Sequence, residues 1–464
     1  MRYFACFLMC FPLPVFAAEP ALTIGFAAVD VSPELGKKPV FLAGFGHDRP
    51  ATKIHDPIMA RAVVLHDGTR TVALVSVDVV GLFLPFVERV RTRSPGFDYV
   101  LVSATHNHEG PDTLGLWGAS PFQSGLDADY LKRVEDGIVS AIATANKSRQ
   151  PAIARIGTAK GPELLVDNRL PEVKLDDLVA IRFDHPTTAK PLGLLVQWNC
   201  HPETLDSKNT EVSADFVAAT VKHLEAKHRC PVAYFTGAVG GLMTSLDVPV
   251  KDDSGKLLQD GTFAKTERYG QLVGELADQA VKAAVRATLT PFELRTRSVL
   301  IPVENPMYKL GWKVGTLKRP AYHWHGNPNP EKLVVTDDIL KPSAVLTEVG
   351  YLQLGELDVA VIPGEIYPEL VLGRVQNPVD PGADFPDAKV EPAIYANLRN
   401  KHRMIVGLGN DELGYFIPKR QWDEKPPYSF GRKKPQYGEE NSVGPESAGI
   451  ICETFRQLTQ RPRK

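Results

Sequence analysis

The chain has 464 residues, of which 43% are hydrophobic and 23% are charged, so it is long enough to bury a core in one large domain or two smaller ones. Its 53 lysine and arginine residues nearly balance 55 aspartate and glutamate residues, which gives a formal net charge of -2. We find no basic run with interleaved aromatic residues that would follow a phosphate backbone. This argues against nucleic acid as a partner.

The first residues, MRYFACFLMCFPLPVFAAEP, have the pattern of an export signal. Arg2 precedes an apolar stretch, and the small residues Ala17 and Ala18 follow it. We therefore predict a signal peptide over residues 1–18 and an exported mature chain, periplasmic or secreted, over residues 19–464. Met9 stands where a lipoprotein signal has a small residue. No later segment reaches the roughly 20 apolar residues of a spanning helix, so we expect no transmembrane segment.

Short apolar runs alternate with amphipathic stretches along the chain, a pattern typical of α/β proteins. Residues 71–80 (TVALVSVDVV) predict a buried strand. Helices are expected at 127–147, with Asp127 as the cap, and at 213–228 and 265–288. We find no internal repeat at the period of a solenoid protein. The pattern predicts an α/β fold with a mixed sheet flanked by helices, in one large domain.

Residues 302–345 are polar and rich in proline. We interpret this segment as a long excursion or lid over the core. A second irregular segment, KRQWDEKPPYSFGRKKPQYGEENSVGPE, precedes a short final helix.

Five predicted strands end in loops of polar and glycine residues. The loops read THNHEGPD, HPE, TGAVGG, PGE and GLGNDELGY, and each follows an apolar run. Sites in α/β proteins assemble at the C-terminal ends of strands, because loops from several strands meet there on a rigid scaffold. We therefore predict that the functional site lies at these strand ends.

His106 and His108 form an H-x-H motif directly after the first of these strands. In extended backbone the two imidazoles point to the same side and can face one ion. His201 adds a third histidine and Glu365 a carboxylate, and a catalytic zinc site needs about three protein ligands beside an open position for water. A second H-x-H motif, at 323–325, follows no strand, so we interpret it as a loop feature.

In the same order along most of the mature chain, these motifs resemble the catalytic domain of the neutral/alkaline ceramidase family. The resemblance rests on LAGFGHDRPATKIHDPIMARAVVL, SVDVVG, THNHEGP, DNR, NCHPE, PGE and GLGNDELGY. Together with the export signal, it implies an exported zinc-dependent hydrolase that cleaves an amide or related acyl bond through a metal-activated water. The expected substrate is a small molecule or a lipid-like compound.

The resemblance also implies roles for single residues. One zinc ion per chain would be held by His106, His201, Glu365 and Tyr415. Glu412 lies in the same loop as Tyr415 and competes with it as the fourth ligand. His108 and Arg169 would act on the substrate carbonyl and on the charge that develops there, in agreement with the proton donor and the cation that such hydrolysis needs.

The chain departs from the family in two ways. Met243, in GGLMTSL, stands where we place a serine of the family's active site, and Thr244 or Ser245 would replace that serine only with a shift of register. Because few residues follow its last motif, we also expect no counterpart of the family's C-terminal β-sandwich module. Both departures weaken ceramide itself as the substrate.

Two other functions stay open. A metallo-β-lactamase-like hydrolase also uses H-x-H after a strand, but it needs an aspartate where this chain has Gly110. The other alternative is a non-catalytic secreted binding protein on the same scaffold.

The remaining predictions concern supporting residues and thiols. Asp56, Asp78 and Glu109 are expected to support the site without binding metal: either Asp78 accepts a hydrogen bond from a histidine, or all three have plain structural roles such as capping or turn formation. Cys200 is expected to be a buried thiol at a strand end, and a Cys230–Cys452 disulfide would be compatible with the sequence. The sequence makes no prediction about oligomeric state.

Overall fold

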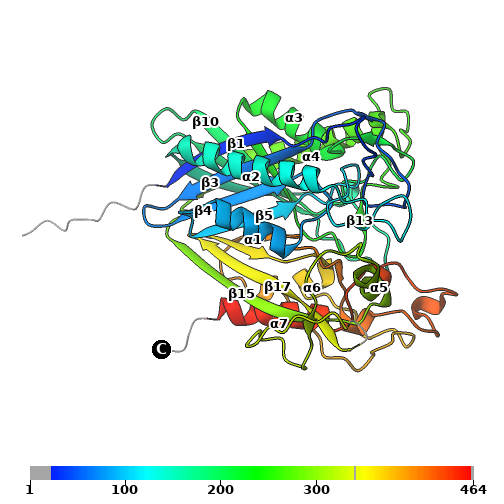
Figure 1. Ribbon diagram of the computed structural model, residues 1–464. Helices are drawn as coiled ribbons and strands as arrows, with labels where there is room; N and C mark the ends of the chain where they lie inside the picture. Colours follow the sequence, from blue (N-terminus) through cyan, green and yellow to red (C-terminus); the bar gives the residue numbers. More distant parts are fainter. Residues whose placement is uncertain (1–21, 339–340, 461–464) are drawn as a thin grey trace, which may run out of the picture.

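The computed structural model describes residues 22–338 and 341–460, and the predicted signal peptide over residues 1–18 lies outside them. Within the described ranges, seven α-helices and three five-stranded sheets form one α/β arrangement (Figure 1). Every sheet combines antiparallel neighbours with one parallel pair, so the expected mixed sheet is present three times. None of the helices in these ranges has the length and apolar character needed to cross a membrane.

The first sheet has the strand order β5-β4-β3-β1-β6. Strands β4 and β5 are parallel and α1 connects them, whereas the other neighbours are antiparallel. Helix α2 packs over β1 and β3. The bounds are β1 (Thr23–Asp30), β3 (Met59–His66), β4 (Thr71–Val77), α1 (Leu84–Arg93), β5 (Tyr99–Ala104), α2 (Ala128–Lys147) and β6 (Gln150–Pro151).

The second sheet repeats this plan in the order β12-β10-β9-β7-β14. Strands β10 and β12 form the parallel pair with α3 between them, and α4 packs over β7 and β9. The bounds are β7 (Ile153–Lys160), β9 (Asp177–Asp184), β10 (Pro191–Trp198), α3 (Phe216–His228), β12 (Val232–Thr236), α4 (Phe263–Lys282) and β14 (Val285–Ala287).

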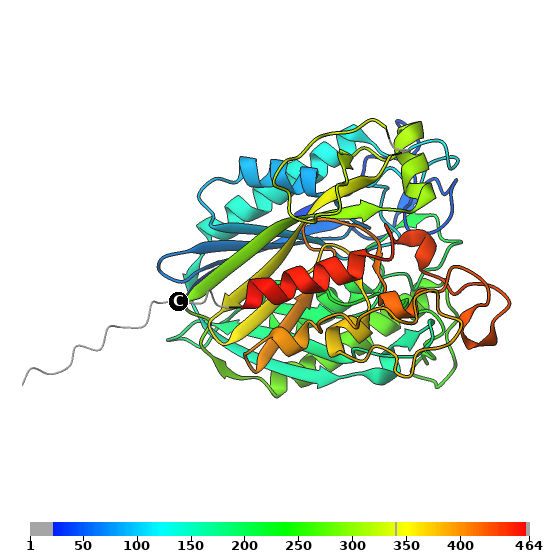
Figure 2. The ribbon, with the colours of Figure 1, turned by 90° about the horizontal axis from the view of Figure 1, so that it is seen from below.

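The third sheet follows the same plan in the order β15-β17-β18-β20, with β16 also paired to β17. Strands β18 and β20 are parallel, α6 connects them, and α7 lies across the outer face of β15 and β17 (Figure 2). The bounds are β15 (Phe292–Val303), α5 (Pro306–Val314), β16 (Tyr322–His323), β17 (Ser343–Leu354), β18 (Leu357–Val361), α6 (Pro368–Leu372), β20 (His402–Val406) and α7 (Ser447–Thr459).

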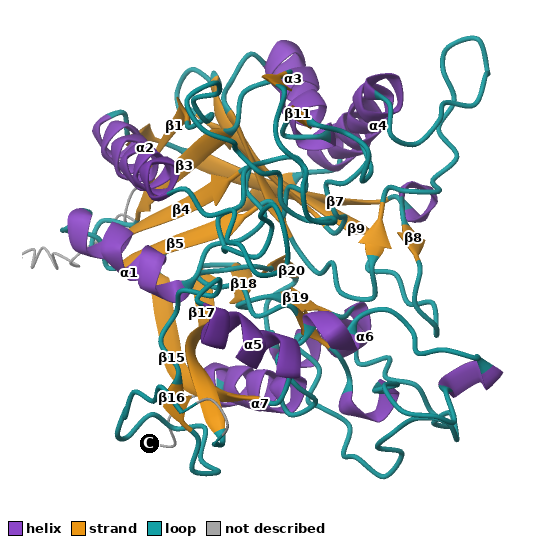
Figure 3. Cartoon of the chain, turned by 45° about the vertical axis from the view of Figure 1, so that its right-hand side comes forward, coloured by secondary structure: helices purple, strands orange, loops and turns teal. Residues whose placement is uncertain are grey.

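The described chain therefore holds three units, each made of one five-stranded sheet and the helices that pack on it, with the same order of elements. No repeat is visible in the sequence. The sheets lie inside and the helices outside (Figure 3). Side chains from all three sheets share one apolar core, which includes Leu101, Phe235 and Val406. This burial fixes the sheets relative to one another, because apolar surface is stable only when it is removed from water.

Hydrogen bonds join the three units where their last strands end. Thr236 Oγ1 donates to the Thr105 carbonyl at 2.7 Å, and the Gly407 N–H donates to the Thr236 carbonyl at 3.0 Å. Ser103 Oγ then donates to the Gly407 carbonyl at 2.9 Å. These bonds close a ring across β5, β12 and β20, and the loops of the predicted site begin at this ring.

Short elements organise the loops beyond the strand ends. Two-residue strands pair between distant loops: β2 (Lys53–Ile54) with β11 (Glu211–Val212), β8 (Val166–Asp167) with β13 (Met243–Thr244), and β19 (Glu365–Ile366) with β21 (Tyr415–Phe416). Single 3-10 turns are η1 (Pro162–Leu164), η2 (Tyr395–Asn397), η3 (Lys419–Gln421), η4 (Ser429–Gly431) and η5 (Glu439–Asn441).

The predicted helices are present with shifted ends. Asp127 caps α2 as expected, since its side chain accepts from the backbone N–H groups of Asp129 and Tyr130. The helix expected at 213–228 begins at Phe216. The helix expected at 265–288 begins at Phe263 and ends at Lys282, because residues 285–287 pair with β7 as strand β14.

The segment expected to be a long excursion is more regular than predicted. Its first residues complete β15, and α5 and β16 follow before β17 begins at Ser343. Arg319, which is 6% exposed, pairs with Asp411 at 2.9 Å and lies over the Phe83 ring. The Thr316 carbonyl packs against Gly115, where a Cβ atom would be only 2.2 Å away. The excursion is thus anchored on two loops that carry predicted site residues.

Candidate metal centre

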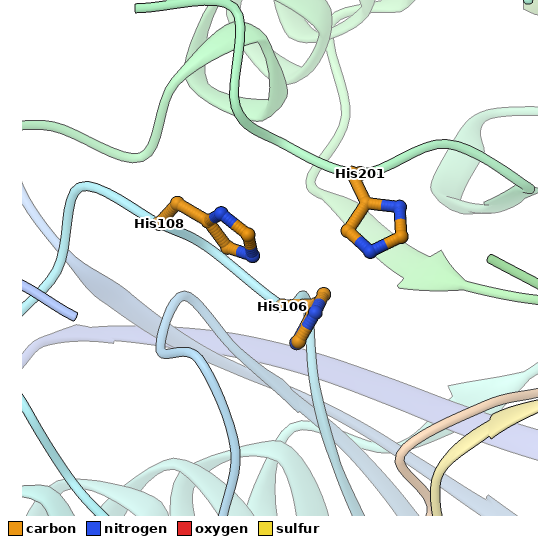
Figure 4. A group of neighbouring side chains, drawn as sticks. All are labelled: His106, His108 and His201. Carbon is orange, nitrogen blue, oxygen red and sulfur yellow. The ribbon is translucent and has the colours of Figure 1, made fainter. Parts of the chain in front are cut away.

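Three histidines meet at the ends of β5 and β10. His106 and His108 follow β5, and His201 follows β10. Each offers a ring nitrogen within 4.8 Å of the others (Figure 4), and all three are buried. His106 has a φ of 67°, a left-handed conformation that is rare for a residue with a side chain. Such local strain persists where the surrounding structure imposes it, often at functional sites.

The imidazoles of His106 and His201 are oriented in the same way. The Nδ1 atom of His106 lies 2.7 Å from the Val80 carbonyl oxygen, and that of His201 lies 2.9 Å from the Met243 carbonyl oxygen. Their Nε2 atoms approach the same oxygen, Oε2 of Glu365, at 3.3 and 2.9 Å. Both nitrogens of each ring therefore face an oxygen acceptor.

A neutral imidazole has one N–H group and so can donate to only one of two acceptors. If Nδ1–H donates to the main-chain carbonyl, Nε2 presents a lone pair toward Glu365. A cation between these Nε2 atoms and the carboxylate would satisfy all three groups, and histidine ligands of metals ordinarily donate their other N–H in this way. The donor set therefore fits a divalent metal.

Glu365 and Tyr415 reach the centre from the third unit. They lie opposite each other in the parallel pair β19–β21, and the Tyr415 hydroxyl is 3.5 Å from His201 Nε2. Burial alone would raise the pKa of Glu365, but His106 and His201 hold it well below the usual range. Burial and the Glu365 charge raise the pKa of Tyr415 well above its ordinary value, so the phenol is neutral without a metal.

Glu412, the competing ligand, is also buried at this centre. Its Oε1 accepts from the Gly414 N–H at 2.6 Å, and its Oε2 has no hydrogen-bond partner in the described chain. Burial and the nearby Glu365 raise the pKa of Glu412 well above its usual value, which favours the protonated acid. The choice between Tyr415 and Glu412 as fourth ligand stays a prediction.

His108 contacts a carboxylate that our sequence analysis assigned to no role. Its Nδ1 lies 3.5 Å from Glu203 Oε2, and its backbone N–H donates to the Pro202 carbonyl. Burial, with His106 and His201 nearby, lowers the pKa of His108 well below its ordinary value. Burial raises the pKa of Glu203. The only sequence signal for this contact was that Glu203 follows His201 in a strand-end loop.

Arg169 lies in a buried ion pair. Its Nη atoms donate to both oxygens of Glu439, at 2.7 and 2.8 Å, and to the carbonyls of Tyr437 and Gln421. Only its Nε–H has no partner in the described chain. The predicted contact between Arg169 and a substrate oxygen can therefore use only this N–H group, and that contact stays a prediction. Nothing in the sequence indicated the Glu439 partner.

The three predicted supporting residues make structural contacts, and none of them reaches a histidine of the centre. Asp56 accepts from Ser213 Oγ at 2.5 Å and from the backbone of Ala214. Glu109 pairs with Arg49 at 2.8 Å. Asp78 accepts from Arg61 at 2.6 Å and from the Met59 N–H at 3.0 Å. The predicted bond from a histidine to Asp78 is wrong, because main-chain carbonyls accept the Nδ1–H groups instead.

Replacing Asp78 with asparagine should destabilise the fold and leave the metal content unchanged. The Arg61 guanidinium would stay buried without its charged partner, and breaking such a pair costs about 3 to 5 kcal/mol. Chemical denaturation and elemental analysis would measure the two effects. Asp129→Asn, at an exposed ion pair with Lys38, is the matched control and should leave both nearly unchanged. Loss of metal from a folded Asp78→Asn protein would contradict this assignment.

Met243 acts through its backbone. It is fully buried in β13, and its carbonyl oxygen accepts from both the N–H and the Nδ1 of His201, each at 2.9 Å. Ser245 Oγ bonds to Thr204 Oγ1 at 2.8 Å. Any side chain at position 243 could supply this carbonyl, so the departure from the family serine leaves the orientation of His201 intact.

The remaining predicted features lie away from the centre. His323 is in β16 at the edge of the third sheet, and the 323–325 motif is absent from the metal-binding group found in the described residues. Cys200, Cys230 and Cys452 are all free and buried. The Cys230–Cys452 disulfide does not form, because the two thiols belong to different apolar cores.

These observations define an α/β protein with a buried centre of histidine and glutamate donors at the shared end of its sheets. The chain is similar over 95% of its length to the crystal structure of neutral ceramidase from Pseudomonas aeruginosa, with a TM-score of 0.70, 16% identity and 74% of that chain covered. It is similar over 95% of its length to a ceramidase complexed with C2, with a TM-score of 0.66, 15% identity and 75% of that chain covered. No family model and no curated protein match the sequence. The chain therefore has a neutral ceramidase-like fold, as the short motifs indicated.

Proposed function

We propose that this chain is an exported, zinc-dependent hydrolase that cleaves an amide or related acyl bond. The observation that carries the proposal is the approach of two histidine Nε2 atoms to one oxygen of Glu365, with both Nδ1 atoms on main-chain carbonyls. With each Nδ1–H donated to its carbonyl, both Nε2 lone pairs would face the Glu365 carboxylate, an arrangement of ligand atoms that suits a divalent cation. The ceramidase-like fold supports the same conclusion independently.

His106, His201 and Glu365 would hold one zinc ion, with Tyr415 as the fourth contact and Glu412 as its competitor. Zinc in such a site supplies Lewis acidity toward a carbonyl and lowers the pKa of bound water from about 15.7 toward roughly 7. The Val80 and Met243 carbonyls keep both imidazoles in the tautomer that presents Nε2. Because the ligand atoms are buried, bulk water is excluded from around them. Charges at the centre therefore interact more strongly than they would in water.

His108 would transfer the proton. A neutral imidazole can accept a proton from the attacking water and then deliver it to the leaving amine, a role that contributes about 100-fold to 10,000-fold. Glu203 Oε2 lies 3.5 Å from His108 Nδ1 without forming a hydrogen bond, and its charge would favour the tautomer that carries hydrogen on Nδ1 and leaves Nε2 free as the acceptor. The Nε–H of Arg169 would stabilise the developing oxyanion, and its other N–H groups hold the segment around Glu439 in place.

The substrate we propose is a small-molecule or lipid-like acyl compound. The support is the pair of ceramidase structures with the same fold. The fold does not favour the metallo-β-lactamase-like alternative. A binding protein without turnover is the remaining alternative, and a centre with both a metal-type donor set and a proton-transfer histidine argues against it.

The mature protein should contain about one zinc per chain. Elemental analysis of the purified chain would measure the metal, and assays on a panel of amides and esters before and after chelation would measure turnover. Activity should fall to background on chelation and return with zinc. A folded chain that hydrolyses the same substrates without metal would contradict zinc dependence, and a zinc-bound chain without turnover on any acyl substrate would favour the binding protein.

A further inference from the structure

A loop over residues 424–437 projects from the end of the molecule where the site-bearing strands terminate (Figures 1 and 2). It carries the exposed cations Lys425, Arg432, Lys433 and Lys434. No carboxylate in the described ranges forms an ion pair with any of them. The loop thus concentrates positive charge on a chain whose overall net charge is -2.

The base of the loop is fixed by buried groups. Asp423, which is fully buried, accepts from the backbone N–H groups of Ser429 at 2.8 Å and Gln436 at 3.4 Å. Its own N–H donates to Glu439 at 2.7 Å. These bonds hold both ends of the loop and leave its tip in solvent.

Three acidic residues around the base of the loop accept hydrogen bonds there. Asp384 accepts from the N–H groups of Glu424 and Lys425, and Asp380 accepts from that of Phe430. Glu424 itself accepts from the Trp422 indole N–H. The acids therefore stabilise the base of the loop and leave the cations at its tip unpaired.

Apolar side chains are exposed beside these cations. Phe430 is 37% exposed and Tyr437 is 47% exposed. Leu170, at 38%, belongs to the same surface, because two hydrogen bonds join its backbone to the side chain of Gln436. Basic and aromatic residues side by side are typical of surfaces that bind at the headgroup level of a membrane.

The loop is also tied to the metal centre. The Tyr437 ring packs against the ring of Tyr415, with centroids 5.9 Å apart. Arg169 bonds both to the Tyr437 carbonyl and to Glu439. The base of the loop therefore contacts the proposed ligand Tyr415 and Arg169.

We propose that the 424–437 loop docks this protein on an anionic lipid surface. Each basic residue held at such a surface strengthens binding by roughly fivefold, and the exposed rings add apolar contact. Four cations in one short loop are too few to follow a nucleic-acid backbone, which favours the lipid surface as the partner. Docking goes beyond the proposed hydrolase activity and does not require it, so the two can fail separately.

The test measures co-sedimentation of the zinc-loaded mature protein with phosphatidylcholine vesicles, with and without phosphatidylglycerol. The loop variant is Arg432→Ser/Lys433→Ser/Lys434→Ser. The matched control, Lys208→Ser/Lys222→Ser/Lys256→Ser, removes the same charge from exposed lysines elsewhere. A third variant, Phe430→Asn, removes the ring, and asparagine tolerates the positive φ of 57° at this position.

The wild type should bind the phosphatidylglycerol vesicles in a salt-sensitive manner and bind the neutral vesicles weakly. The loop variant should lose roughly 100-fold in partition coefficient, Phe430→Asn about tenfold, and the control variant little. Circular dichroism, zinc content and activity on a soluble substrate should be equal in all four proteins. Equal binding to both vesicles, equal losses in the loop and control variants, or tighter binding of a DNA oligonucleotide than of vesicles would each overturn the proposal.

Discussion

Replacing His201 with alanine should remove the bound zinc and the hydrolytic activity together. The substitution deletes one of two Nε2 donors that face Glu365 and leaves the main-chain carbonyl of Met243 without its Nδ1 partner. Loss of an outer hydrogen-bond partner already lowers zinc affinity about 10-fold to 100-fold, so loss of a ligand should exceed that. Competition with a chelator would measure affinity, and turnover on the best substrate should fall to background.

Met243→Leu is the matched control for this experiment. It changes the side chain beside His201 but keeps the carbonyl that orients the imidazole, and swaps of similar volume in a core usually cost less than about 1.5 kcal/mol. Zinc content and turnover should therefore be retained. Thermal unfolding with and without added zinc separates misfolding from metal loss, because a ligand stabilises only a protein that binds it. A His201→Ala protein that keeps both zinc and turnover would contradict the proposed ligand set.

The strand-end loops could be predicted because their signals are local. An apolar β-rich run followed by histidine, glutamate or glycine is visible in a few residues, and all five predicted strands are present as β5, β10, β12, β18 and β20. Parallel strands direct their C-terminal ends to one edge of each sheet, and hydrogen bonds between the ends of β5, β12 and β20 bring these edges of the three sheets together. His106, His201 and Glu365 were placed together from sequence for this reason.

The three-sheet arrangement could not be predicted in the same way. Strand pairing joins residues far apart in the chain, and the pairing of β14 with β7 spans more than a hundred residues. That pairing ended the helix expected to run to residue 288, since tertiary contacts override local helix propensity. The three units share an element order but no visible sequence repeat, so this symmetry is evident only in the structure.

The hydrogen-bond and ion-pair partners of single polar residues also could not be predicted from the sequence. Asp78 was expected to accept a hydrogen bond from a histidine. Instead its carboxylate forms an ion pair with Arg61 of the neighbouring strand β3. Arg169 and Glu439 are 270 residues apart, and no short motif links them. Such contacts depend on which loops the fold brings together. The sequence could therefore indicate that His106, His201 and Glu365 lie together, but not which groups their neighbours bond to.

Replacing His108 with alanine should separate metal binding from catalysis. His108 lies within 4.8 Å of the other two histidines, but its Nδ1 faces Glu203 and not Glu365. We therefore expect the zinc content to stay near one per chain and turnover to fall about 100-fold to 10,000-fold, the range for a lost proton-transfer group. His323→Ala, in the other H-x-H motif at the sheet edge, is the matched control and should keep full activity.

Glu203→Gln tests the proton-transfer role of His108 through its neighbouring carboxylate. Glutamine keeps the size of the side chain but not the charge that favours hydrogen on His108 Nδ1, so turnover should fall less than in His108→Ala, with zinc retained. Nitrogen-15 NMR of the histidine rings should show a changed tautomer for His108 alone, a signature that a purely structural role would not produce. If His108→Ala loses zinc together with activity, His108 is a metal ligand, and the division of labour between the two histidines of THNHEGPD is different from the one proposed.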